Sequence, residues 1–356
     1  MVEKLVAIAP KDTFVPMETC TIGTDPEIFA FKAGKLLPAF EFLPSKDKPV
    51  VTSLTSAYWD GFQAEFRHMR GFHCLMEFHS ELRSSMGLLY QEAKKHDAKL
   101  SIQSVVRIPL SVLRTANDPF VELGCQPSFN AYKLEGLKVE NPRKLRYRFA
   151  GGHMHFGFNK KPAHETIVKS LDSILGIWAV GAAKSFDNPI RRQYYGLPGE
   201  YRLPTYSSAR TGVEYRTLSN FWLSHPAISM VTWEIGRRAV QLAATGFPKA
   251  IWIGAEQEIQ EAILTSNVKM AKSILKRNEA IFKWLFTSRN WTSQMMQRAF
   301  DIGLNGIESE IKDPTDITKN WKLDEPVIGN TFNAYSSRPY WSWAGHCDIT
   351  RKAHIS

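Results

Sequence analysis

Residues 150–158 read AGGHMHFGF, and this stretch does most to define the fold. Polar and aromatic residues alternate along it, which is the two-residue period of a β-strand. His153 and His155 are therefore expected on one face of that strand. A glycine pair inside a strand pattern indicates a bulge or a close backbone approach, and Gly151-Gly152 predicts such a feature here.

Two other segments repeat the two-residue spacing with charged side chains. Asp25 and Glu27 flank Pro26, and Glu214 and Arg216 flank Tyr215. If both segments are strands, each pair shares a sheet face. A face that carries carboxylates, imidazoles and an arginine is a poor hydrophobic core, but it suits divalent metal and phosphate.

A hairpin adds a further acid. Asp60-Gly61 is a turn signal, and the strand after it places Gln63, Glu65 and Arg67 on one face. We interpret Asp60 mainly as a turn residue and Glu65 as the ligand candidate.

The donor set favours a hard cation. Glu27, Glu65 and Glu214 offer carboxylate oxygens, which Mg²⁺ or Mn²⁺ prefers. His153 and His155 with a carboxylate leave open a second interpretation, a single-metal hydrolase or oxygenase.

Arginines gather in the irregular segment 189–210. Arg191, Arg192 and Arg202 lie among its Gly, Pro and Tyr residues, and the planar guanidinium suits carboxylate and phosphate. Long irregular segments inside a domain are often functional.

Strands in the first 225 residues and helices afterwards predict an α+β protein. Apolar periodicity predicts helices near 79–99, 163–186, 227–245, 255–273 and 277–301. We expect one catalytic domain over 1–320, with a sheet core at 20–225 and a helical part at 226–302. Residues 321–356 form an aromatic-rich tail without clear periodicity.

Composition excludes several classes. Hydrophobic residues make up 44% of the 356 residues and charged residues 22%, as in ordinary globular proteins. No uninterrupted apolar run reaches about 18 residues, so we expect no membrane span and a cytoplasmic location. No C-x-x-C pair, P-loop or G-x-G-x-x-G motif occurs.

The net charge of +10 indicates an anionic partner. Nucleotide phosphates, acidic substrates and nucleic acid all remain open, so a third interpretation is a non-enzymatic, basic, nucleic-acid-binding protein. The aligned strand acids argue against this last one.

Five segments occur in an order that resembles the phage-associated carboxylate–amine ligases of type 2, within the glutamine synthetase and glutamate–cysteine ligase superfamily. The segments are GTDPEIF (23–29), WDGFQAEF (59–66), LGCQPSFNAY (123–132), AGGHMHFGF (150–158) and RRQYYGLPGEYR…GVEYRTLSNFW (191–222). The resemblance implies a mainly antiparallel sheet curved into a funnel, with helices on its outer face and ATP with Mg²⁺ or Mn²⁺ on its concave face. It also implies ATP-dependent amide formation through an acyl phosphate, from a small-molecule or peptide carboxylate and an amine.

The resemblance assigns roles by position. Glu27, Glu65 and Glu214 resemble metal ligands, with Asp25 beside them, and His153 is similar to a histidine near the metal and phosphates. Arg216 resembles an arginine at the transferred phosphate. His155 and Arg202 join Arg216 as catalytic candidates, and Arg191 and Arg192 join His153 and Arg216 in cofactor binding.

One position departs from the family pattern. An acid is expected in the Gly-Cys-x-Pro-acid-Phe-Asn-Ala segment, and this chain has Ser128 there. If that acid positions the amine, the amine specificity differs here. The sequence identifies neither substrate and gives no oligomeric state.

Overall fold

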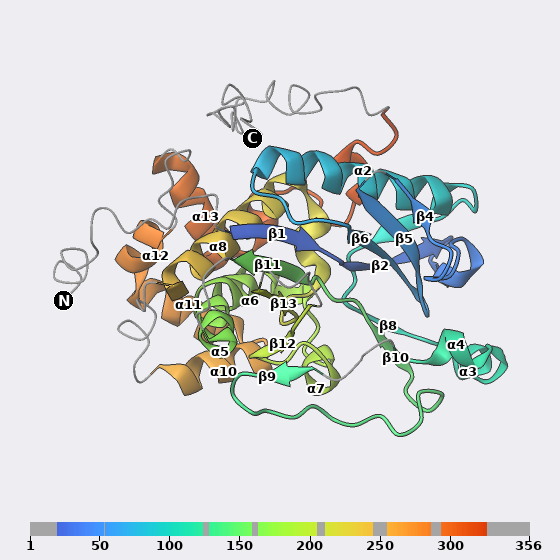
Figure 1. Ribbon diagram of the computed structural model, residues 1–356, viewed down its shortest axis with the longest axis horizontal. Helices are drawn as coiled ribbons and strands as arrows, with labels where there is room; N and C mark the ends of the chain where they lie inside the picture. Colours follow the sequence, from blue (N-terminus) through green and yellow to red (C-terminus); the bar gives the residue numbers. More distant parts are fainter. Residues whose placement is uncertain are drawn as a thin grey trace.

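All strand pairs in the described part of the chain are antiparallel, which confirms the α+β class. The protein is seen in a computed structural model that describes residues 20–52, 54–123, 128–158, 163–204, 211–244, 255–285 and 293–325. Figure 1 shows strands through the centre and one end of the molecule and helices gathered at the other end.

The first sheet holds the histidine-bearing strand at an inner position. Its order is β1-β11-β13-β12-β9. The bounds are β1 Cys20–Thr24, β11 Met154–Phe158, β13 Thr211–Tyr215, β12 Glu200–Arg202 and β9 Phe129–Asn130. Ile22, Phe156 and Val213 lie opposite one another across three strands, and all three are buried. This row is the apolar face of the sheet.

The second sheet is built around the Asp60-Gly61 hairpin. It runs β3-β2-β6-β5-β4, and β7 also pairs with β2. The bounds are β2 Glu27–Lys32, β3 Lys35–Leu37, β4 Val50–Val51, β5 Thr55–Asp60, β6 Gln63–His68 and β7 Lys99–Ser101. A separate pair joins β8 Val105–Arg107 to β10 Tyr147–Phe149.

The chain passes from the first sheet to the second at Asp25-Pro26. β1 ends at Thr24 and β2 begins at Glu27, so Asp25 and Glu27 belong to no common strand. Our expectation of one strand with both acids on one face is therefore wrong. Pro26 has no N–H and cannot donate to a ladder, which is why pairing stops there. The strand expected over 213–222 also ends early, at Tyr215, and Arg216 follows it.

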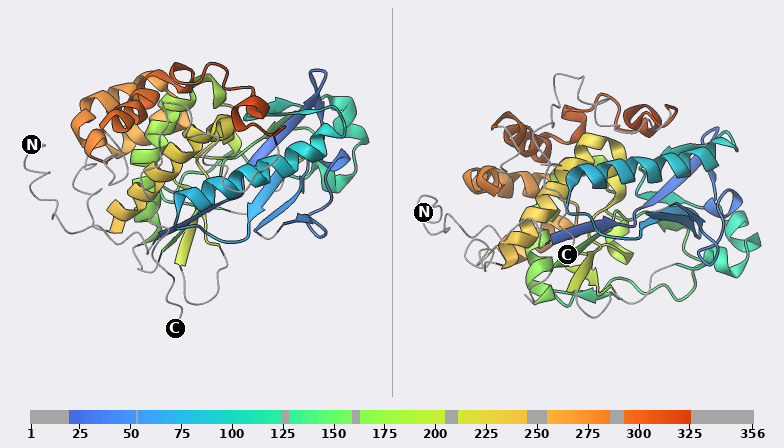
Figure 2. Two further views of the ribbon diagram at one scale, coloured as in Figure 1. Left: turned by 90° about the horizontal axis from the view of Figure 1, so that it is seen from above. Right: turned by 45° about the horizontal axis from the view of Figure 1, so that its top comes forward.

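Helices cover the apolar faces of the sheets. α5 and α8 pack on the first sheet, and α2 packs on β5, β6 and β7 (Figure 2). The longer helices are α2 Leu75–Lys94, α5 His164–Leu171, α6 Ile177–Ala183, α8 Pro226–Ala244, α10 Glu256–Leu264, α11 Val268–Arg277, α12 Glu279–Leu285 and α13 Ser293–Asn305. The shorter ones are α3 Leu110–Thr115, α4 Asp118–Val121, α7 Arg191–Tyr194 and α14 Ile317–Trp321. The 3₁₀ turns are η2 Ala39–Glu41, η4 Lys184–Phe186, η5 Asn220–Ser224 and η6 Ile307–Ser309.

The helix expected over 163–186 is present, with a π-helical turn η3 at Asp172–Gly176 between α5 and α6. His164–Phe186 is long and apolar enough to cross a membrane by length and composition, and 89% of its most apolar window is buried inside the protein. Burial of that extent is typical of the core helix of a folded domain. The π turn places the Asp172 side chain, which is 0% exposed, in that core.

The folded region continues past residue 320. Arg83 of α2 donates hydrogen bonds to the backbone oxygens of Trp321, Lys322 and Glu325, and the Trp321 side chain is buried. The start of the segment that we expected as a tail therefore packs on α2. Residues 326–356 lie outside the described part of the chain.

Candidate functional site

A polar row crosses the first sheet on the face opposite the apolar row. The strand register places Gly23 of β1 beside His155 of β11, His155 beside Glu214 of β13, and Glu214 beside Arg202 of β12. The alternation of AGGHMHFGF thus has the predicted effect, since Phe156 points to the core and His155 points away from it.

Asp25, His155 and Glu214 form what we call the histidine cluster. Their ligand atoms lie within 4.8 Å of one another, and the Asp25 Oδ1–His155 Nε2 distance is 2.7 Å. Asp25 and Glu214 are buried. Two buried carboxylates and an imidazole at this spacing form a donor set that fits a divalent cation when the imidazole is neutral.

Positive groups surround the histidine cluster. Arg216 Nε and Arg202 Nη1 each lie 3.6 Å from Glu214 Oε1, and Arg67 Nη2 lies 3.6 Å from Asp25 Oδ2. Burial raises the pKa of Asp25, but His155 and His153 outweigh it and hold that pKa well below its usual value. Burial also lowers the pKa of His155, and Asp25 and Glu214 reverse this to raise it. The two carboxylates of the cluster are thus offset by nearby cations.

Glu27, Asp60 and Glu65 form the carboxylate cluster on the second sheet. Their ligand oxygens also lie within 4.8 Å of one another. Glu27 and Glu65 are direct partners across β2 and β6. Tyr58 of β5 faces Glu65 and donates a hydrogen bond of 2.5 Å to its Oε1.

The carboxylate cluster carries excess negative charge. Burial, with the charges of Asp25, Asp60 and Glu27, raises the pKa of Glu65 well above its usual value. Burial also raises the pKa of Glu27 and of Asp60. Within the described chain, none of the three acids forms an ion pair with Lys, Arg or His. Two buried acids and the half-buried Asp60, without an ion-pair partner in the described chain, form a donor set that Mg²⁺ or Mn²⁺ satisfies.

The Gly151-Gly152 pair brings the two clusters together. The Gly151 N–H donates to Glu27 Oε2 at 2.6 Å, and the Glu27 N–H donates to the Gly151 oxygen at 2.9 Å. A Cβ on Gly151 would collide with His153 and the Tyr195 hydroxyl, and one on Gly152 would collide with the Ser219 oxygen. The close backbone approach predicted from the sequence is confirmed.

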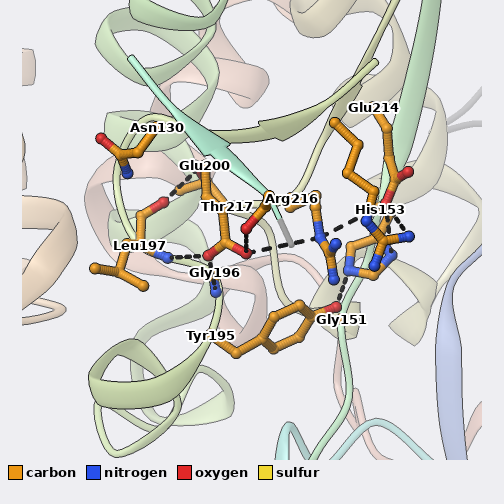
Figure 3. Close-up of polar contacts among 12 residues, drawn as sticks. Asn130, Gly151, His153, Tyr195, Gly196, Leu197, Glu200, Glu214, Arg216 and Thr217 are labelled. Atoms are coloured by element: carbon orange, nitrogen blue, oxygen red, sulfur yellow. Dashed lines mark hydrogen bonds and ion pairs between the residues drawn. The ribbon is translucent and has the colours of Figure 1, made fainter. Parts of the chain in front are cut away.

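His153 stands between the two clusters. Its Nδ1 lies 3.6 Å from Asp25 Oδ1 and 3.8 Å from Glu214 Oε1, and its Nε2 contacts the Tyr195 hydroxyl. Its charge also acts on Glu27 of the carboxylate cluster. Figure 3 shows His153 beside Glu214 and above the Tyr195 ring.

Arg216 lies between two carboxylates, as Figure 3 shows. Its Nε is 3.6 Å from Glu214 Oε1 and 3.7 Å from Glu200 Oε1, and its guanidinium lies 5.1 Å from the centre of the Tyr195 ring. Glu200 Oε2 accepts the N–H groups of Gly196 and Leu197. Glu200 therefore fixes both Arg216 and the loop before β12.

Ser128 has a partner that explains part of its role. Its hydroxyl donates to Glu200 Oε1 at 2.9 Å. The residue that stands where the family pattern has an acid thus contacts an acid from β12.

Arg191 and Arg192 bind their own loop. Arg191 donates to Asp187 Oδ1 and the Thr217 oxygen, and Arg192 donates to Asp187 Oδ2 and the oxygens of Gly196 and Thr217. They are 0% and 2% exposed. The structure places neither guanidinium in the two clusters, and it gives both a clear part in holding the segment that carries Tyr195.

The predicted metal ligands are therefore brought together as two groups. Glu27 and Glu65 meet, while Glu214 and Asp25 meet with His155 instead of His153. Asp60 is the acid that the sequence interpretation missed as a ligand candidate. A signal was present: the two-residue turn pairs Asp60 with Gln63, which puts Asp60 on the face of Glu65.

Comparison with known proteins identifies the class. Residues 143–323, just over half of the chain, match the family described as phage phiEco32-like COOH.NH2 ligase-type 2, so the chain belongs to this family of carboxylate–amine ligases.

Among solved structures, one match is the complex between the prokaryotic ubiquitin-like protein Pup and its ligase PafA. The identity is 11%, with 92% of this chain and 71% of that chain covered and a TM-score of 0.44. The search of curated proteins gave no match.

Proposed function

We propose that this ligase uses ATP and a divalent cation, Mg²⁺ or Mn²⁺, to join a carboxylate to an amine. The carboxylate oxygen attacks the γ-phosphorus of ATP, and ADP leaves with its bonding electron pair. The amine nitrogen then attacks the acyl phosphate, loses a proton and expels inorganic phosphate. Membership of the carboxylate–amine ligase family supports the overall reaction.

The carboxylate cluster is the observation that carries the ATP proposal. Burial raises the pKa of all three acids, the neighbouring acids raise it further for Glu27 and Glu65, and none of the three forms an ion pair among the described residues. Glu27, Asp60 and Glu65 would hold a cation, which would neutralise polyphosphate charge when bound. A cation at Asp25, His155 and Glu214 fits the second donor set.

Basic side chains beside the clusters would offset the remaining negative charge of the phosphates. Arg216 and Arg202 border Glu214, and we assign them to the transferring phosphoryl group. Asp25 and Glu214 raise the pKa of His155 against the effect of burial, so His155 would carry a proton there only while no cation is bound to this cluster. His153 lies against both clusters and would orient the phosphates.

The substrates are proposed by class. The carboxylate and the amine would be small molecules or peptides, and the site of action would be the cytoplasm, where ATP is abundant. Ser128 in place of an acid indicates an amine contact that differs from the family pattern.

Thermal unfolding tests the proposal. We would compare wild type, Glu65→Gln and the matched surface control Glu140→Gln with ATP, with Mg²⁺ and with both. A ligand at 100 times its Kd stabilises the folded state by about 2.7 kcal/mol, which is a shift of several degrees. We expect the full shift only with both ligands, in wild type and Glu140→Gln but not in Glu65→Gln.

The absence of a shift at millimolar ATP and Mg²⁺ in wild type would reject ATP use, while family membership would stand. Tight zinc or iron in the purified protein would then direct attention to the histidine cluster as a single-metal site.

A further inference from the structure

A basic hollow lies on α11, in the helical part of the molecule. It has a volume of about 870 Å³ and is lined by Val268, Lys269, Lys272, Ser273, Lys276 and Arg277. Figures 1 and 2 place α10–α13 at the end of the molecule away from β4, β5 and β6. The hollow is therefore separate from the two clusters.

Helix geometry gathers the lysines on one face. Lys269, Lys272 and Lys276 are spaced by three and four residues, so they follow one another along a stripe. The opposite face of α11 buries Ala271, Ile274 and Leu275 in the core. This burial fixes the rotation of the helix, and the lysine stripe must point outward.

The lysines form no ion pair within the described chain, and several acids of α10 and α12 pair with other bases. Glu256 binds Lys169, Glu258 binds Arg277 and Glu279 binds Lys283. Glu261 of α10 forms no ion pair with them either. Three positive charges therefore stand unneutralised in a protein whose net charge is already +10.

The form of the stripe identifies its partner. The seven-residue step from Lys269 to Lys276 rises about 10 Å along the helix, so the flexible lysine stems can reach neighbouring phosphates of one nucleic-acid backbone. The hollow presents no aromatic anchor of the kind that protein interfaces use, and its one apolar residue is Val268. Lysine is a point charge on a flexible stem, which suits phosphate contact without base recognition.

We propose that the α11 face, formed by Lys269, Lys272 and Lys276, binds the phosphate backbone of double-stranded nucleic acid independently of sequence. The binding is distinct from the proposed ligase reaction and requires neither ATP nor Mg²⁺. It would hold the ligase on a nucleic acid while the clusters at the other end remain open to substrates.

Salt dependence gives a test that depends on this face alone. The probe is a fluorescein-labelled 20-base-pair DNA duplex of random sequence, titrated with full-length protein from 50 to 200 mM NaCl. Each phosphate contact contributes about −0.9 to the slope of log K against log salt concentration. The triple variant K269Q/K272Q/K276Q should therefore reduce the magnitude of the slope by about 2.7. Its loss of affinity between 50 and 200 mM NaCl should be about 40-fold smaller than that of wild type.

The matched control removes the same charge elsewhere. K35Q/K99Q/K138Q replaces three exposed lysines that lie on other elements, and it should keep the wild-type slope. Equal slopes in the two triple variants would show that general positive charge attracts the DNA, and no binding by wild type at 50 mM would remove the basis for the proposal; either result overturns it. Thermal unfolding with ATP and Mg²⁺ should be unchanged in K269Q/K272Q/K276Q, so failure here is distinct from failure of the ATP proposal.

Discussion

The carboxylate cluster and the histidine cluster are neighbours with opposite charge balance. Glu27, Asp60 and Glu65 oppose one another's ionisation, whereas Asp25 and Glu214 are surrounded by His155 and by arginines. The first group needs a cation to be fully charged, and the second is largely neutralised by the chain itself. Cation affinity should therefore differ between the two clusters, although the ligand atoms are equally close together in both.

The first expected effect is on cation binding. Glu65→Gln removes the acid whose pKa is raised furthest among the three and should weaken Mn²⁺ binding at least about tenfold, as measured by calorimetry. Glu214→Gln should weaken it less, because Arg216 and Arg202 already offset that carboxylate. Equal losses in the two variants would contradict the difference that we draw between the clusters.

Without metal, Glu65→Gln should not be harmful to the protein, and the quantity to compare is the free energy of unfolding. Removing one of three mutually repelling acids should leave Glu65→Gln as stable as wild type or slightly more stable in urea unfolding without metal. A large loss of stability would show that the Tyr58–Glu65 hydrogen bond outweighs the repulsion.

The next effect concerns the shape of a positive group. Arg216→Lys keeps the charge but loses the planar guanidinium, whose Nε lies near both Glu214 and Glu200. We expect ADP release with candidate substrates to fall by about 10²–10³-fold while ATP–Mg²⁺ still raises the melting temperature. Retained turnover would mean that a positive charge at position 216 is sufficient and that the shape of the guanidinium is not needed.

A smaller effect concerns the pH dependence of stability, through the buried acid Asp172 next to the histidine cluster. Tyr215, between Glu214 and Arg216, donates a 2.6 Å hydrogen bond to Asp172, and burial raises the pKa of Asp172 to about 7. Because the unfolded carboxyl ionises near 4, its contribution to stability is complete below about pH 4 and is lost as pH rises through about 7.

Asp172→Asn keeps an acceptor for Tyr215 and does not titrate. Urea unfolding at pH 5 and pH 8 should therefore show a smaller decline in the free energy of unfolding than in wild type, by about 2–4 kcal/mol. A decline equal to that of wild type would show that other groups control the pH dependence.

The smallest expected effect is at Ser128. Ser128→Ala removes one hydrogen bond to Glu200 at an exposed position and should change stability by about 0.5–1 kcal/mol or less. Any change in amine preference in the same variant would connect Ser128 to substrate choice, and an unchanged preference would confine it to supporting Glu200.

Local pattern predicted much of the fold. Alternation placed His155 outward and Phe156 inward, and helical pattern placed α2, the α5–α6 helix and α8. The segment expected as one helix over 255–273 contains α10 and α11, and the short helices α3, α4 and α7 were not expected. The correct predictions succeed because the faces of strands and helices follow from periods of two and 3.6 residues. The periodic patterns could not show that the strands form separate sheets, since the break depends on which distant strands pair.

The sequence predicted most of the residues of the site, but not which of them lie together. Asp25 and Glu27 were expected together, but Pro26 separates them into two sheets. Arg191 and Arg192 illustrate a different limit. An arginine in an irregular loop can serve a ligand or the loop's own backbone oxygens, and only the folded path of residues 187–217 shows the second use.

The tripeptide Asp25-Pro26-Glu27 has a consequence for how this chain can change over evolution. Asp25 belongs to the histidine cluster and Glu27 to the carboxylate cluster. Because only Pro26 lies between them, the backbone itself limits the distance between the two clusters. A substitution at Asp25 or Glu27 alters one centre and leaves the other in place. An insertion or deletion of one residue there would reverse the facing of β2 and remove Glu27 from the carboxylate cluster while Asp25 stayed. The length of this tripeptide therefore matters to both clusters at once.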